Sequence, residues 1–242
     1  MRVLVAGASG VIGQPLVKLL LTAGHSVIGT SRSPIRAERL RSLRVTPLVI
    51  DVYDAQALGN AVAAARPEIV VHLLTDLPDR IDPDGMAEMS ARNARVRIEG
   101  TRNLIAAVVR SGARRLVAQS IAWAYVPGRE PHVEEDPLDM EAEGNRGVTV
   151  HGVAELERLV GSVPRLEALI LRFGQLYGPG TWNAGPTGSV PLHVEAAARA
   201  AALAVVRGGP GTYNVVEDGS AASNVKARGQ LGWDPAIRCR VP

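Results

Sequence analysis

Met1-Arg-Val-Leu-Val-Ala-Gly-Ala-Ser-Gly-Val-Ile-Gly13 is the stretch that decides the fold. The apolar run at residues 3–6 predicts a buried strand, and the amphipathic segment at residues 11–23 predicts a helix. Three glycines occupy the junction between them, so the chain opens with a strand, a glycine-rich turn and a helix. This order is typical of a turn that binds a phosphate group.

The three glycines have separate predicted roles. Gly7 lets the chain turn sharply off the strand. Gly10 lets backbone N–H groups approach a pyrophosphate, and Gly13 lets the helix pack closely on the strand. The helix N-terminus then offers partial positive charge and N–H donors to an anion; a turn of small residues without a ligand is the alternative. The predicted pyrophosphate site consists of Gly7, Ser9, Gly10, Val11, Ile12 and Gly13.

Length and composition fit a single α/β domain with ample core, or such a domain with a small added lobe. The chain has 242 residues, of which 46% are hydrophobic. Its net charge of +3 is spread along the chain, and the basic stretch at residues 32–44 is interpreted as a solvated helix face. We therefore expect a small-molecule substrate and no nucleic-acid partner.

Several other classes of protein are excluded by what the sequence lacks. Cys239 is the single cysteine, so neither an internal disulfide nor a cysteine-rich metal site is expected, and no other metal site is predicted. No run of residues approaches the ~20 apolar residues needed to cross a membrane. The first residues form a predicted core strand rather than a signal peptide, so we expect a soluble, cytoplasmic protein.

Predicted strands and helices alternate along the chain. Most strands are short apolar runs, as expected for parallel strands buried on both faces, and a long helix is predicted at residues 86–111. This alternation predicts an α/β fold: a doubly wound (Rossmann), mostly parallel sheet with a small, trimmed C-terminal lobe. After the first strand, the predicted strands are Ser26–Thr30, Leu43–Ile50, Ile69–Leu74, the run that ends near Ser120, and Leu166–Phe173.

The end of the second strand predicts which dinucleotide binds. An acidic residue there accepts hydrogen bonds from the adenosine ribose of NAD, whereas an arginine accommodates the 2′-phosphate of NADP. The stretch at residues 30–34 has no carboxylate, but Ser31 and Arg32 can bind a phosphate, and Arg36 lies near. We therefore expect NADP(H) rather than NAD(H); a surface arginine on a loop is the alternative interpretation of Arg32.

The fourth predicted strand ends at the expected cofactor crevice. Leu73 and Leu74 lie at its carboxyl end and should line that crevice. His72 lies inside the apolar run, where a histidine is more often a hydrogen-bonded core residue than a catalyst.

Three motifs along the chain carry a family resemblance. They are the spacing Gly-x-x-Gly-x-x-Gly, the helix Gly100-Thr-Arg-Asn-Leu-Ile-Ala-Ala and the run Leu171-Arg-Phe-Gly-Gln-Leu-Tyr-Gly-Pro-Gly180. Together they resemble the extended short-chain dehydrogenase/reductases, in particular the NAD(P)-dependent epimerases and dehydratases. The chain departs from that pattern at Arg97, where the family usually has asparagine. The resemblance implies that Asp51 and Val52 contact the adenine; an Asp N-cap of the next helix is the alternative.

The resemblance also implies an organisation of the chain. Residues 1–177 should form the dinucleotide-binding core, with an insertion at 126–147 near the substrate site, and residues 178–242 a mixed region with a small substrate lobe and closing helices. Few residues separate Gly180 from His193, which argues against a bulky nucleotide-sugar substrate. A homodimer through two long helices would be usual for this resemblance.

The proton-donating pair of the resembled family is missing from the sequence. That family places a tyrosine and, four residues later, a lysine on one helical face, where the ammonium lowers the tyrosine pKa from ~10 toward neutrality. No tyrosine here is followed by a lysine at that spacing. With the helix anchored at Glu157, the two positions fall on Thr149 and Val153, and a shift of one residue gives Val150 and Ala154, so neither register restores the pair.

Three other residues are candidates for catalysis near the expected nicotinamide end. Tyr125 can donate a proton or pack against the insertion. Ser120 can orient a substrate oxygen or form a strand-end hydrogen bond. His151, with Glu155 one turn later on the same face, can act as an oriented general acid or form an exposed pair.

The sequence thus predicts an NADP(H)-binding oxidoreductase or epimerase-like enzyme that acts on a small apolar or aromatic metabolite without the usual tyrosine–lysine pair. Two alternatives stay open because a fold does not settle a function. One is an NADP-binding sensor or interaction protein with altered catalytic groups. The other is a non-redox cyclase or isomerase on the same fold.

Overall fold

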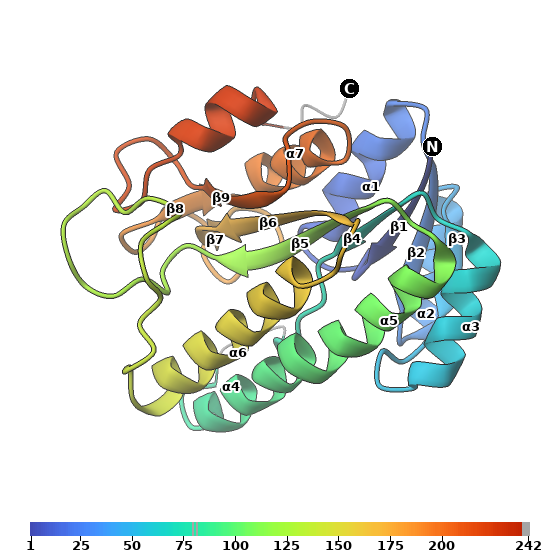
Figure 1. Cartoon of the computed structure of the whole chain (residues 1–242), viewed down its shortest axis with the longest axis horizontal. Helices are drawn as coiled ribbons and strands as arrows, with labels where there is room; N and C mark the ends of the chain where they lie inside the picture. The colour runs from blue at the N-terminus through green and yellow to red at the C-terminus, as the bar shows by residue number, and fades with distance from the viewer. Residues whose placement is uncertain (79, 81, 239–242) are drawn as a thin grey trace.

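A parallel sheet forms the centre of the structure, a computed structural model that describes residues 1–78, 80 and 82–238. Within these residues, seven parallel strands form one sheet in the order β3-β2-β1-β4-β5-β6-β9 (Figure 1). The predicted doubly wound α/β fold is therefore confirmed, while Cys239 lies outside the described residues. The strands are β1 (Arg2–Ala6), β2 (Ser26–Ser31), β3 (Thr46–Val49), β4 (Ile69–His72), β5 (Arg115–Ile121), β6 (Glu167–Phe173) and β9 (Gly211–Val215).

Helices cover both faces of the sheet, with α1 and α7 on one side and α5 and α6 on the other (Figure 1). Because alternate side chains of a strand point to opposite faces, Val3 and Val5 pack in one core cluster and Leu4 packs in the other. The first cluster includes residues of α1 (Gly13–Thr22), α2 (Pro34–Ser42) and α7 (Val194–Ala204). The second includes residues of α3 (Ala55–Ala65), α5 (Thr101–Ser111) and α6 (Gly144–Gly161).

The predicted long helix at residues 86–111 is present, with an irregular turn in its middle. It consists of α4 (Met86–Arg95), a π-helical turn η1 (Val96–Gly100) and α5. Single π-helical turns within α-helices often occur at functional sites. α4 lies against α6 (Figure 1) at small residues, since a Cβ on Gly152 would come within 3.1 Å of Ala94 Cα. This close packing also brings η1 against α6.

Residues beyond 177 contribute to the main sheet as well as to a small lobe. α7 and β9 belong to the central layers, whereas β7 (Gln175–Tyr177) and β8 (Pro191–His193) form a separate parallel pair, and η2 (Ala227–Leu231) follows β9. The division of the chain at residue 177 therefore stays a prediction. None of the helices in the described parts of the chain combines the length and the hydropathy that crossing a bilayer requires.

Candidate functional site

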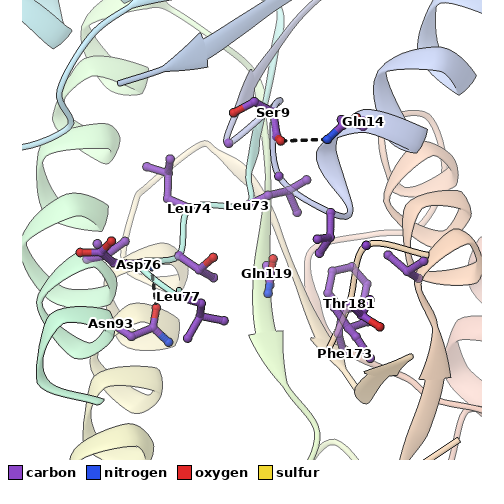
Figure 2. A pocket seen from close by; sticks show the side chains of 18 of the residues that line it. Ser9, Gln14, Leu73, Leu74, Asp76, Leu77, Asn93, Gln119, Phe173 and Thr181 are labelled. Atoms are coloured by element: carbon purple, nitrogen blue, oxygen red, sulfur yellow. Dashed lines mark hydrogen bonds between the residues drawn. The ribbon is translucent and has the colours of Figure 1, made fainter. Parts of the chain in front are cut away.

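A cavity of about 1730 Å³ opens at the carboxyl ends of the strands. The loops after β1, β2, β4, β5 and β6 all contribute to its lining. Figure 2 shows Ser9 after β1 and Leu73, Leu74 and Asp76 after β4. β1 lies between β2 and β4, so the strand order reverses here, and open α/β sheets bind ligands at such a switch point. The volume exceeds the roughly 300–1,000 Å³ of usual ligand pockets, so the cavity has room for a dinucleotide and a small substrate together.

The glycine-rich turn forms one wall of this cavity. Gly7 has a φ of +90°, and a Cβ there would lie 2.8 Å from the Leu73 carbonyl oxygen. A Cβ on Gly13 would collide with the Gly7 carbonyl oxygen. Both positions therefore exclude every side chain, in agreement with the turning and packing roles predicted for these two glycines.

The N-terminus of α1 lies at the same wall, where Val11 and Gln14 line the cavity. Gly10 lines the cavity and its own N–H donates to the Gly7 carbonyl oxygen at 3.0 Å. The N-cap residue is Ile12, whose apolar side chain makes no capping hydrogen bond. Gln14 N and Leu16 N donate to the carbonyl oxygens of Gly10 and Ile12, and Pro15 has no N–H, so the donors left for an anion are those that precede Gln14. This short run of backbone N–H groups at the helix N-terminus fits a pyrophosphate.

Nine predicted cofactor residues line the cavity, and three do not. Ile12 is buried in the core, Gly13 packs against the turn, and Asp51 is exposed. Asp51 Oδ1 accepts a hydrogen bond from Tyr53 N at 3.0 Å, whereas Asp54 is the N-cap of α3, so Asp51 neither lines the cavity nor caps that helix. The nine that line the cavity are Gly7, Ser9, Gly10, Val11, Ser31, Arg32, Val52, Leu73 and Leu74.

Basic side chains gather where β2 ends. Arg32 Nη2 pairs with Asp76 Oδ1 at 3.0 Å, and Arg36 and Arg39 also line the cavity. Asn93 Oδ1 accepts a hydrogen bond from the Asp76 N–H at 3.1 Å (Figure 2), which fixes the loop after β4 beside α4. This end of the cavity is therefore cationic, with Asp76 holding Arg32 in place.

His72 is the hydrogen-bonded core histidine that the apolar run favours. It is 1% exposed, and its Nδ1 accepts a hydrogen bond from Leu74 N at 3.2 Å. That acceptor role places the proton on Nε2, which donates to Thr101 Oγ1 at 2.8 Å. Burial lowers the pKa of His72 to about 4. The neutral ring thus holds the cavity-lining loop in place, and His72 itself does not line the cavity.

Ser120 is buried on the side of β5 that faces away from the cavity. Its Oγ donates to Glu157 Oε1 at 2.6 Å. Because successive side chains of a strand alternate, Gln119 and Ile121 line the cavity instead, and Figure 2 shows Gln119 there. Ser120 therefore forms the strand-end hydrogen bond of the alternative interpretation and is not placed to orient a substrate oxygen.

Tyr125 is also buried away from the cavity. Its hydroxyl donates to Asn214 Oδ1 at 2.6 Å and accepts from Arg172 Nη1 at 2.8 Å. Its ring stacks on His132 of the insertion, with ring centroids 4.9 Å apart. Burial raises the pKa of Tyr125, which is opposite to the shift that a proton-donating phenol needs near neutral pH. The packing interpretation of Tyr125 is the one that the structure supports.

Arg172 joins these two residues in one buried hydrogen-bond network. Its guanidinium binds Glu157 through both carboxylate oxygens, with Nε–Oε1 at 2.9 Å and Nη2–Oε2 at 2.7 Å. Burial lowers the pKa of Arg172, but the hydrogen bonds to Glu157 and its charge outweigh burial and raise the pKa overall. The Arg172 network, as we name it, consists of Ser120, Tyr125, Glu157, Arg172 and Asn214.

His151 lies outside the lining of the cavity, on the exposed side of α6. Its Nδ1 bonds the Gly147 carbonyl oxygen at 2.8 Å. Glu155 pairs with Arg158 at 2.7 Å rather than with His151. The predicted oriented general acid is therefore not formed by these residues.

The α6 positions that the sequence analysis assigns to the family's tyrosine and lysine, Thr149 and Val153, have different surroundings. Thr149 lines the cavity, and Val153 is fully buried in an apolar cluster. Thr149 and Gln119 are among the residues with which α6 and β5 line the cavity, together with Ile121, Asn145 and Arg146. Gln119 was not predicted, although the alternation of side chains along β5 was a signal that could have found it.

Arg97 is a second lining residue that sequence reasoning left without a role. It belongs to η1, is 7% exposed and lines the cavity beside Thr149. Its Nη1 donates to the Thr149 carbonyl oxygen at 3.4 Å. Burial lowers the pKa of Arg97 to about 10, so the side chain stays protonated at neutral pH.

A doubly wound sheet with an anion-binding turn at its switch point defines a dinucleotide-binding protein of the Rossmann class. The model of the NAD dependent epimerase/dehydratase family matches residues 3–218, and the chain belongs to this family. Proteins of this family depend on a nicotinamide cofactor.

Characterised relatives include enzymes with different reactions. The chain is 45% identical over 239 residues to a 3-diazoavenalumate denitrifying reductase of a Streptomyces species, an alignment that covers 90% of this chain and 76% of the relative. It is 30% identical over 203 residues to a UDP-glucose 4-epimerase of Mycolicibacterium smegmatis, which covers 81% of this chain and 63% of the relative.

Solved structures confirm the fold. The UDP-glucose 4-epimerase of Thermus thermophilus in complex with NAD superposes with a TM-score of 0.78 at 21% identity, covering 98% of this chain and 94% of that one. Pal from Bacillus thuringiensis superposes with a TM-score of 0.80 at 17% identity, covering 98% and 95%. At these identities the likeness shows the fold alone.

Proposed function

We propose that this protein is an NADPH-dependent reductase that removes the nitrogen of a diazo group from a small carboxylate. The name of the relative with 45% identity describes reduction with loss of nitrogen from a diazo compound whose name has a carboxylate ending. That likeness extends over 90% of this chain.

The observation that carries the proposal is the composition of α6 where it lines the cavity. Reduction of a carbonyl creates an oxyanion and needs a proton donor beside it. Here α6 lines the cavity with Asn145, Arg146 and Thr149, Val153 is buried, and no tyrosine or lysine occurs anywhere in this helix. A threonine hydroxyl is far too weak an acid to replace a phenol beside an ammonium.

A diazonium carbon has no such requirement. When it takes a hydride, a C–H bond forms, the C–N bond breaks, and the electron pair of that bond leaves with dinitrogen. The charges of the cation and the hydride cancel, so no oxyanion forms and no proton is transferred. A cavity without the phenol–ammonium pair therefore suits this reaction better than it suits reduction of a ketone.

The described residues fit a nicotinamide dinucleotide, which when bound would supply the hydride. The turn at Gly10 and Val11 would hold the pyrophosphate against the N-terminus of α1. Ser31 and Arg32 would hold the 2′-phosphate of NADP at the cationic end of the cavity. Gln119 and Thr149, on the opposite wall, would orient the reacting carbon and keep water from it.

Isotope transfer tests the reaction. A cinnamate that carries a diazonium group on its ring should consume NADPH, release dinitrogen and yield cinnamate. With NADPH deuterated at C4, tested as both stereoisomers, the deuterium should appear at the carbon that carried nitrogen, and none should come from D2O. A reaction without enzyme provides the background rate. No turnover with bound cofactor would favour the sensor alternative, and product without oxidation of NADPH would favour non-redox chemistry.

Cofactor titration tests the NADP preference separately. We expect NADPH to bind about 10-fold or more tightly than NADH, because a phosphate bound by an arginine gains charge-assisted hydrogen bonds. Arg32→Ala should remove most of that difference. Arg41→Ala is the matched control, since Arg41 lies on the adjacent helix α2, is exposed and does not line the cavity. Equal affinities for the two cofactors in the wild type would contradict the preference.

A further inference from the structure

We propose that Arg97 is the residue that binds the carboxylate of the substrate and so sets the substrate class to small organic anions. This inference rests on the proposed function only for the identity of the reacting group. The position of Arg97 is itself a departure from the family, which usually has asparagine there. Arg97 lines the cavity from η1, the π-helical turn that packs against α6.

The hydrogen bonding of Arg97 is incomplete. A guanidinium has N–H donors in a planar fork and no acceptor. One of them donates to the Thr149 carbonyl oxygen at 3.4 Å, which is long for such a bond. Among the residues that the structure describes, no carboxylate pairs with Arg97 and no other acceptor bonds it. Because Arg97 lines the cavity and none of its nitrogens is among the buried atoms without a partner, its remaining donors are open to a ligand there.

Other buried arginines of this protein show what a structural arginine looks like. Arg115 is 8% exposed, and it pairs with Glu167 at 2.8 Å and donates to three backbone carbonyl oxygens. Arg172 is 5% exposed and pairs with Glu157 through both oxygens. Arg97 is buried as deeply as these two but has no counter-ion in the described structure.

A buried cation without a partner is costly, and its cost is recovered when an anion binds. A carboxylate matches the guanidinium fork through two parallel N–H···O bonds, which a neutral amide cannot do. The second arginine on this side, Arg146, is already engaged by Asp139 at 3.1 Å and by the carbonyl oxygens of Trp123 and Tyr125. Arg97 is therefore the residue left for the anion.

The side chains that line the cavity near Arg97 favour a substrate whose carboxylate is attached to an aromatic or apolar group. Trp123 and Phe173 both line the cavity, and Figure 2 shows Phe173 and Leu77 on either side of Gln119. A planar acid such as cinnamate combines a ring for these side chains with a carboxylate for Arg97. Cinnamamide has the same shape without the charge and serves as its neutral counterpart.

Binding of these two probes to the NADP⁺-saturated protein tests the proposal without any diazo chemistry. Calorimetry should show that the wild type binds cinnamate about 10- to 100-fold more tightly than cinnamamide, the range expected for hydrogen bonds to a charged group. Arg97→Asn, which restores the residue usual in the family, should abolish that difference, and Arg97→Lys should keep part of it. Arg102→Asn is the matched control, because Arg102 is exposed on the same long helix and does not line the cavity.

Cofactor affinity, measured on the same variants, separates the two anions that Arg97 can meet. NADPH should bind all four proteins within about threefold of one another. Loss of NADPH affinity in Arg97→Asn with unchanged cinnamate binding would assign Arg97 to a cofactor phosphate and overturn the proposal. A wild type that binds both probes equally, or neither, would overturn it as well. Carboxylate selectivity without turnover of the diazonium compound would refute the proposed reaction and leave Arg97 in this role.

Discussion

Two buried arginines, Arg172 and Arg97, both contact α6, but only Arg172 has a carboxylate partner there. Arg172 meets Glu157 near the C-terminal end of α6, and Arg97 meets Thr149 near its N-terminal end. The contacts are eight residues apart, or roughly 12 Å along the helix. Arg172 has a carboxylate and further acceptors, whereas Arg97 has one long bond to a carbonyl oxygen within the described residues.

The difference separates a structural charge from a charge kept for a ligand. In the Arg172 network the folded chain supplies every partner, so the charge is compensated before anything binds. Arg97 has no carboxylate partner in the described residues, and the cavity that it lines has room for one supplied by a ligand. Burial alone does not mark a functional residue; burial without a partner at the wall of a cavity does.

The strongest way to break this comparison is to remove the paired arginine. Arg172→Met leaves Glu157 buried without its counter-ion, so the free energy of unfolding should fall by about 3 to 5 kcal/mol. Urea denaturation measures this loss. The double variant Arg172→Met with Glu157→Gln should recover part of it, because it removes the stranded charge. A loss below about 1 kcal/mol would mean that the Arg172 network does not hold the fold together.

His72 extends the comparison to a buried group that avoids its charge. Its pKa in the folded protein is about 4, against 6.5 for an ordinary histidine. Between these pH values the unfolded chain binds a proton that the folded chain does not. The stability that the neutral ring contributes is therefore present above pH 6.5 and declines as the pH falls toward 4, by up to about 3 kcal/mol.

The variant His72→Asn isolates this effect because asparagine does not titrate. The stability difference between wild type and variant should shrink by about 3 kcal/mol when urea denaturation is repeated at pH 4 instead of pH 7. His25 and His193, whose pKa values are also lowered, are present in both proteins and cancel. A constant difference across this pH range would show that His72 does not stay neutral in the folded protein.

The fold could be predicted from the sequence because its signals are local. The turn at residues 1–13, the apolar runs and the long helix at residues 86–111 each report on neighbours within a few residues. The same holds for Gly7 and Gly13, whose exclusion of side chains follows from the turn itself. Nine of the twelve predicted cofactor residues line the cavity.

The catalytic candidates could not be placed in this way because their surroundings come from distant parts of the chain. Tyr125 is buried by partners 47 and 89 residues away, Arg172 and Asn214. Whether Ser120 faces the cavity depends on the register of β5, since a shift of one residue moves a side chain to the other face of the sheet. Arg97 was visible as a departure from the family, but its missing partner became evident only once α6 was packed beside it.

Variants of the buried candidates sharpen the distinction between network and cavity. Tyr125→Phe leaves Arg172 and Asn214 short of one hydrogen-bond partner each, so stability should fall by about 1 to 3 kcal/mol. The rate constant kcat for reduction, measured well below the melting temperature, should change by less than about threefold. A proton donor would instead lose about 100-fold or more on removal of its hydroxyl. Such a loss would return Tyr125 to the active site.

The smallest expected effect has the opposite sign and tests the comparison most directly. Arg97→Met removes a buried cation that lacks a counter-ion, so without ligand the variant should be more stable than the wild type by about 1 kcal/mol. The gain is modest because the cavity gives the guanidinium some access to water. Arg102 is exposed on α5, which continues the helix that contains Arg97, so the stability of Arg102→Met should stay within about 0.5 kcal/mol of the wild type. Saturating cinnamate should then raise the stability of the wild type but leave Arg97→Met unchanged, since only the wild type gains a counter-ion. If Arg97→Met is as destabilising as Arg172→Met, then Arg97 is a second structural arginine, and its charge does not serve to bind a ligand.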